Sequence, residues 1–152
     1  MNKNLRLPID IELRRHAGQS VLVLSFRREA LRDWCLGLCL LKEGLIETLT
    51  VAEERGGAAV KIRVLDKPKV PGRANVNFRS DMSQLEVPRT SLEYIQAFFL
   101  RYYRDEVSEV DHVDLEAIDS DTGKRDEYIT FCVPDSRPPV SAKEAEERLR
   151  GQ

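Results

Sequence analysis

The chain has 152 residues, of which 41% are hydrophobic and 33% charged, and this length suits one domain with its own core. Its longest strongly apolar run, 34–41, is shorter than the roughly 20 residues that cross a bilayer, so we expect no membrane span. A formal net charge of −2 argues against a bulk electrostatic attraction to nucleic acid.

The first predicted elements are two strands and a helix. Residues 9–14 alternate apolar and charged side chains, which predicts a strand with one wet face, and the apolar run 21–26 predicts a strand covered on both faces. Apolar residues at three- and four-residue spacing predict a helix over 28–42, which Gly44 ends. Because its apolar stripe reaches almost around the helix, we expect this helix to be buried deeply or shared with a partner.

A hairpin and an irregular connection follow. Segments 46–53 and 58–65 flank Gly56 and Gly57, which permit the positive φ of a tight turn. Two prolines and a glycine within 67–73 predict an irregular connection, which divides the chain near its middle.

The second half repeats this order of elements. Segments 74–79 and 84–87 predict a hairpin, and a helix begins at Thr90 or Ser91 and runs to about Arg104. A shift of about 65 residues brings the first half onto the second, which indicates an internal duplication of a ββαββ unit.

The chain ends with a hairpin and a tail. Segments 110–118 and 128–133 predict the last hairpin, and the tail over 134–152 contains a short charged helix that begins with a capping box at Ser141.

We therefore predict an α+β fold. Residues 1–133 form one domain with pseudo-halves 7–66 and 74–133. The domain holds an antiparallel sheet of about eight strands with two main helices on one face. The tail, 134–152, adds the short C-terminal helix.

Charge is segregated along the chain. Residues 1–104 carry a net charge of +6 and residues 105–152 a net charge of −8. An acidic segment can mark an interaction surface, although on a globular protein it is more often a solvated face. Aromatic residues and arginines, which dominate interface hot spots, recur densely over 94–104. The predicted interface residues are Tyr94, Arg101, Tyr102, Tyr103, Arg104, Asp111, Asp114 and Glu116.

A basic stretch from 55 to 79 has two interpretations. It can follow a phosphate backbone, or it can form a solvated hairpin that supplies ion-pairing partners to the acidic third, and we favour the second. The candidate nucleic-acid contacts are Lys61, Arg63, Lys67, Lys69 and Arg73.

Two other groups of residues suggest chemistry. His112, Asp114 and Glu116 share one face of a predicted strand, where a carboxylate can orient the imidazole as a general base. Cys35 and Cys39 lie in an apolar setting that raises a thiol pKa, which favours packing over reactivity. The odd number of cysteines predicts free thiols, and we expect neither a metal nor a cofactor.

Three functions follow, in order of preference. The first is a non-enzymatic protein-binding module of the inhibitor or immunity type, whose partner is a basic protein or a second copy of the chain. The second is a nucleic-acid-binding protein, and the third is a small hydrolase-like enzyme with His112 as base. The first eight residues carry no apolar secretion signal, so we expect a cytoplasmic protein.

Overall fold

Two helices and the nine strands of one sheet follow one another in the part of the chain that the structure describes. The structure is a computed structural model, and it describes residues 1–105, 112–134 and 150. The first half contains β1 (Asn2–Leu7), β2 (Ile9–His16), β3 (Gln19–Phe26), a 3₁₀ turn η1 (Arg28–Ala30), α1 (Leu31–Lys42), β4 (Thr48–Glu53) and β5 (Ala59–Leu65). The second half contains β6 (Ala74–Asn77), β7 (Met82–Pro88), α2 (Arg89–Asp105), β8 (His112–Asp119) and β9 (Glu127–Cys132).

The sheet is mixed, with the strand order β1-β4-β5-β7-β6-β8-β9-β3-β2. The four hairpins are antiparallel, and three of them are the hairpins that the sequence predicts. The pairs that join them, β1 with β4, β5 with β7, β6 with β8 and β3 with β9, are parallel. The prediction of an α+β fold with two helices is confirmed, and the prediction of an antiparallel sheet of about eight strands is wrong. α1 connects β3 with β4 and α2 connects β7 with β8, so a helix lies within the connections that lead to the parallel pairs β1 with β4 and β6 with β8. The parallel pair β5 and β7 is instead connected through the loop after β5 and through β6.

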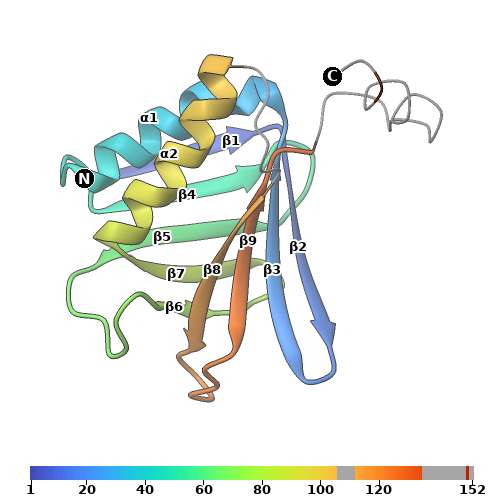
Figure 1. Ribbon diagram of the computed structural model, residues 1–152, viewed down its shortest axis with the longest axis vertical. Helices are drawn as coiled ribbons and strands as arrows, with labels where there is room; N and C mark the ends of the chain where they lie inside the picture. The colour runs from blue at the N-terminus through green and yellow to red at the C-terminus, as the bar shows by residue number, and fades with distance from the viewer. Residues whose placement is uncertain (106–111, 135–149, 151–152) are drawn as a thin grey trace.

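A corner at Pro8 curls the sheet on itself. β1 and β2 are separated only by Pro8, yet they lie at opposite ends of the strand order. Backbone hydrogen bonds hold this corner, from Glu54 N–H to Leu7 O at 3.0 Å and from Arg27 N–H to Pro8 O at 3.1 Å. Strands β1, β4, β5, β7 and β6 therefore run across Figure 1, while β8, β9, β3 and β2 run down it.

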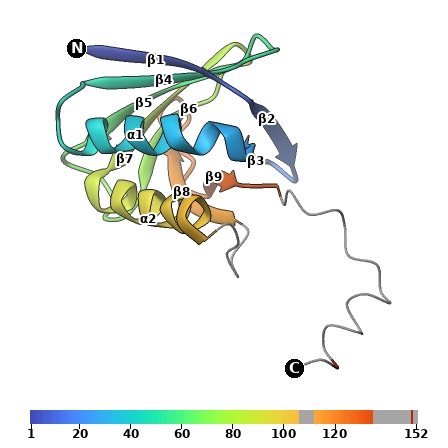
Figure 2. The ribbon, with the colours of Figure 1, turned by 90° about the horizontal axis from the view of Figure 1, so that it is seen from above.

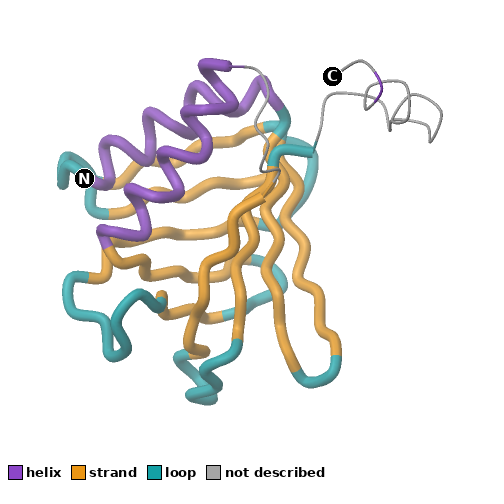
Figure 3. Tube along the Cα trace, in the orientation of Figure 1, coloured by secondary structure: helices purple, strands orange, loops and turns teal. Residues whose placement is uncertain are grey.

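Both helices lie on the same face of the sheet, inside its curvature (Figures 1 and 2). Between the helices and strands lies an aromatic cluster formed by Phe26, Trp34, Phe99 and Phe131, all of them fully or almost fully buried. The Trp34 and Phe26 rings stack with centroids 4.6 Å apart, and Phe99 meets both rings edge-on. The core is centred here, and the lower ends of the β2–β3 and β8–β9 hairpins extend beyond the helices (Figure 3).

The pairing pattern agrees only in part with the predicted repeat: β5 with β7 and β9 with β3 are equivalent pairs, but β1, which pairs with β4, lies outside the repeat. In the first half β4 pairs with β1 and β5 with β7; in the second half β8 pairs with β6 and β9 with β3, all in parallel. Trp34 and Phe99, which the shift of about 65 residues superposes, contact each other with ring centroids 5.7 Å apart. The two helices thus meet at these aromatic residues, and the duplication itself stays a prediction.

Several local predictions have a definite outcome. Gly44 has φ +75° just after α1, as predicted for its end. Gly56 and Gly57 do not have positive φ, so the tight-turn prediction is wrong: residues 54–58 form a longer loop between β4 and β5. A Cβ at Gly56 would instead collide with the Glu53 carboxylate. The wide apolar stripe of α1 is only partly buried, since Leu36 is 53% exposed.

The predicted C-terminal helix falls on residues outside those that the structure describes, and the domain limit at 133 stays a prediction. Among the described residues, no helix has the length and apolar character that a membrane crossing requires.

Candidate functional site

A groove of about 340 Å³ lies between α2 and β8. α2 contributes Tyr94 above a buried Ile95, and β8 contributes Asp114 and Glu116, whose side chains point away from the core because strand residues alternate. The fold thus brings together an aromatic residue and two acidic residues that the sequence predicts as parts of one interface. The remaining lining residues are Gly72, Thr90, Ser91, Val113 and Leu115.

The carboxylates of the groove are held by neighbouring side chains. The Thr130 hydroxyl donates a hydrogen bond of 2.6 Å to Asp114 Oδ1, and the other oxygen of Asp114 lies 3.7 Å from His112 Nε2. Glu116 Oε2 lies 3.2 Å from Arg73 Nε. Both carboxylates remain about half exposed, so they stay accessible to a partner from solution.

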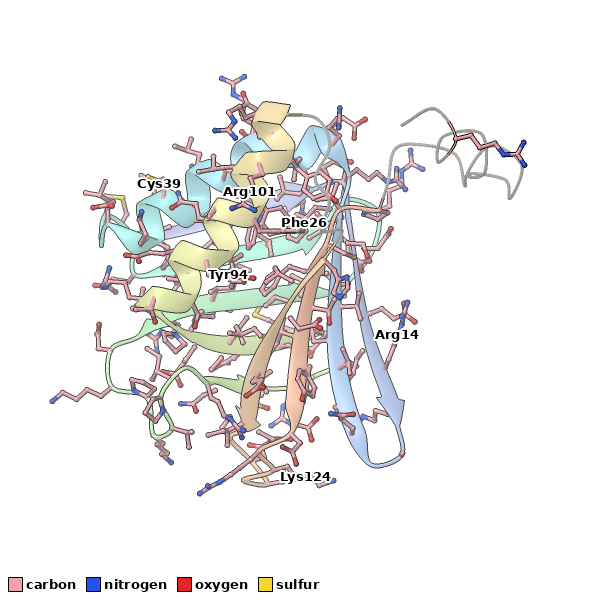
Figure 4. The ribbon with its side chains drawn as sticks, viewed as in Figure 1. Arg14, Phe26, Cys39, Tyr94, Arg101 and Lys124 are labelled. Carbon is pink, nitrogen blue, oxygen red and sulfur yellow. The ribbon has the colours of Figure 1, made fainter. Side chains whose placement is uncertain are left out.

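The aromatic residues of α2 divide between the core and the surface. Tyr94 is 67% exposed and Tyr103 56% exposed, while Tyr102 is 7% exposed and packs against Phe98 with centroids 5.3 Å apart. Arg101 and Arg104 are exposed, and Figure 4 shows Tyr94 and Arg101 on the outer side of α2. Tyr102 is therefore a core residue, and Asp111 lies outside the described residues.

The proposed catalytic residues do not form an enclosed site. His112 and Asp114 are about half exposed, and their 3.7 Å separation exceeds hydrogen-bond length. Glu116 interacts with Arg73. Within the described ranges no group of three His, Cys, Asp or Glu side chains is placed to hold a metal ion. This geometry gives little support to a general base at His112.

The basic and acidic segments meet in space. β6 and β8 are parallel neighbours, and this pairing brings the basic residues before and after β6 to the acidic hairpin β8–β9. Arg73 pairs with Glu116, and Arg79 Nη1 lies 3.2 Å from Asp121 Oδ2. The favoured interpretation of the basic stretch, as ion-pairing partners of the acidic third, is confirmed for these two arginines.

The nucleic-acid candidates are dispersed. Lys61 and Arg63 lie on β5, on the sheet face away from the helices, while Lys67 and Lys69 belong to the connection before β6. Arg73 is occupied by Glu116 and by a 2.7 Å hydrogen bond that it donates to Arg125 O. No continuous basic track joins these five residues.

The cysteines behave as packing residues. Cys35 is buried on α1, and burial raises the pKa of its thiol to about 11, whereas Cys39 and Cys132 are half-buried. At pH 8 only about one Cys35 in a thousand is then a thiolate, since each pH unit below the pKa reduces that fraction tenfold. We expect iodoacetamide at pH 8 to alkylate Cys35 more slowly than Cys39 and Cys132, as measured by mass spectrometry of peptides over time. Equal rates for all three thiols would contradict this prediction.

The sequence analysis missed a second group of polar residues. Asn75 and Asn77 on β6, with Gln84 and Glu86 on β7, lie beside Lys61 and Arg63 on the face opposite the helices. Their period-two spacing identifies a shared face, but only the parallel pairing of β5 with β7 brings them next to the lysine and arginine.

Comparison of the chain with protein-family models and with curated protein sequences gave no match.

Proposed function

We propose that this protein is a non-enzymatic binding module that receives a protein partner in the groove between α2 and β8. The observation that carries the proposal is the position of Tyr94, which is 67% exposed at the edge of a groove that also contains two carboxylates. When a partner covers a tyrosine that is exposed to this extent, much apolar surface is removed from contact with water. Tyrosines are also enriched among interface hot spots.

The groove favours a basic side chain from the partner. A guanidinium or ammonium group can lie over the Tyr94 ring and form a cation–π contact of about 0.5–2 kcal/mol. The same cation can reach Asp114, which has a second oxygen beyond its hydrogen bond with Thr130. A basic protein, such as the target of an inhibitor of the immunity type, supplies such groups and would be captured faster because of the complementary charge.

A photo-cross-linking experiment tests the proposal. Benzoylphenylalanine replaces Tyr94 in one version of the full chain and Arg32 in a matched control, because Arg32 is also an exposed helical residue but lies on α1 outside the groove. Illumination in the native host is expected to give a discrete cross-linked protein with position 94 only. Mass spectrometry identifies it, and Asp114→Lys in the same chain is expected to reduce its yield roughly tenfold.

Three outcomes would contradict the proposal. The first is an equal product from positions 94 and 32, and the second is no product from position 94. The third is a product of twice the mass of the chain, because such a product would show that the groove binds a second copy of the chain and not a different protein.

A further inference from the structure

Six polar side chains form a regular array on the sheet face opposite the helices. The register places Lys61 beside Gln84 and Gln84 beside Asn77 in one row. A second row, two residues along each strand, contains Arg63, Glu86 and Asn75. Side chains in register on neighbouring strands are about 5 Å apart, and those two residues along a strand are about 7 Å apart, so one small molecule can reach all six.

The side chains of this array are unpaired among the residues that the structure describes. Across the described residues, none of the six forms a side-chain hydrogen bond or an ion pair. Arg63 does not pair with Glu86, although the register places them side by side. Two arginines next to β6 do form ion pairs, Arg73 with Glu116 and Arg79 with Asp121. The array is therefore a group of donors and acceptors whose hydrogen-bonding capacity is unused in the described part of the chain.

The array surrounds a hollow of about 100 Å³. This volume holds several water molecules, and it suits a tetrahedral anion with part of an attached group. Lys61, Asn75, Asn77 and Glu86 are half-buried, so the hollow has walls. Asn77 Oδ1 is fully covered yet accepts no hydrogen bond in the described structure, an unfavourable state that a rotation of the amide toward a ligand would relieve.

We propose that this hollow binds a small phosphomonoester of a hydroxylated molecule, such as a sugar phosphate. The Lys61 ammonium and the Arg63 guanidinium bind the phosphate oxygens through charge-assisted hydrogen bonds. The three amides can donate to phosphate or hydroxyl oxygens, and the Glu86 carboxylate accepts from a hydroxyl group of the ligand. The site lies on the opposite face of the sheet from the helices and is independent of the proposed protein interface.

Titration of the full chain by calorimetry and by amide NMR tests this site. The probes are ribose 5-phosphate, ribose and inorganic phosphate. Ribose 5-phosphate is expected to bind with a dissociation constant below about 1 mM and to shift amides of β5, β6 and β7. Inorganic phosphate is expected to bind roughly tenfold more weakly, and ribose not measurably, because each makes only part of the contacts.

Matched variants assign the contacts. Lys61→Gln and Arg63→Gln are each expected to weaken ribose 5-phosphate binding at least about tenfold, whereas Lys69→Gln, which removes the same charge from the connection before β6, leaves it unchanged. Glu86→Gln is expected to weaken binding of ribose 5-phosphate but not of inorganic phosphate. These paired results would distinguish a specific site from a general effect of charge.

Other results would overturn the inference. Absence of saturable shifts up to about 10 mM ribose 5-phosphate is one, and equal weakening by Lys69→Gln and Lys61→Gln is another. An oligothymidine of ten nucleotides serves as a further probe, since nucleic acid also carries phosphate. If the oligothymidine binds more tightly than ribose 5-phosphate and Lys69→Gln weakens its binding, the basic residues bind a nucleic-acid backbone and not a small molecule.

Discussion

Replacing Trp34 with alanine is expected to lower the free energy of unfolding by about 3–5 kcal/mol. Trp34 has no exposed surface, and its ring contacts Phe26, Phe99 and Phe131 at the meeting point of the two halves. Alanine would leave a cavity bounded by α1, α2 and two strands. These elements are closely packed against the rest of the sheet, so they cannot move inward to fill the cavity without disturbing that packing. Urea denaturation followed by circular dichroism measures the change.

Two further variants make this experiment decisive. Trp34 Nε1–H is buried without an acceptor in the described structure, so Trp34→Phe removes an unsatisfied donor and is expected to cost less than half as much as Trp34→Ala. Leu36→Ala, on the exposed side of the same helix, is expected to change stability by less than about 1 kcal/mol. A loss at Leu36 as large as the loss at Trp34 would contradict the assignment of the core.

The second large effect is expected at Glu53, which closes the curled sheet. Its Oε2 accepts a 3.2 Å hydrogen bond from Ile11 N–H on β2, and its Oε1 accepts one of 3.2 Å from Ala58 N–H. Alanine at this position would leave both half-buried donors without an acceptor, at a cost of about 2 kcal/mol. Glu53→Gln keeps an amide oxygen for one of them and is expected to cost about half as much. Urea denaturation of both variants checks these values.

Controls for Glu53 come from its neighbours. Glu54→Ala alters an exposed carboxylate next in sequence and is expected to change stability by less than about 0.5 kcal/mol. Gly56→Ala would force a Cβ against the Glu53 carboxylate, so its cost is expected to fall when Glu53 is already alanine. If the stability changes of the two substitutions at 53 and 56 prove additive, the close approach of Gly56 to the Glu53 carboxylate does not determine the conformation of the loop.

The sequence predicted local elements well because their signals are local. The alternation in 9–14, the spacing of apolar residues in α1 and the position of Gly44 each involve only residues close in the chain. Parallel pairing leaves no such signal, since a strand has the same alternation whichever neighbour it meets. β1 was missed because Asn2–Leu7 is mostly polar, and Pro8 was not identified as a corner between two strands.

The same limit applies to the candidate sites. Tyr94, Asp114 and Glu116 were predicted from residue type, and the crossover after β7 brings them to one groove. Residue type alone could not place Tyr102 in the core, nor reveal that Arg73 is occupied by Glu116. The polar array on β5, β6 and β7 was missed because asparagine and glutamine are ordinary on a solvent-exposed strand face until three strands in register align them.

The pairing of β3 with β9 has a consequence for synthesis of the chain. The β2–β3 hairpin leaves the ribosome early, but the strand that covers its inner edge is the last one of the sheet to be made. During translation this edge of β3, rich in Val and Leu, lacks its partner while nearly the whole domain is still being added. Newly made chains would depend on rapid completion, or on a chaperone that shields the edge, to avoid joining one another through it.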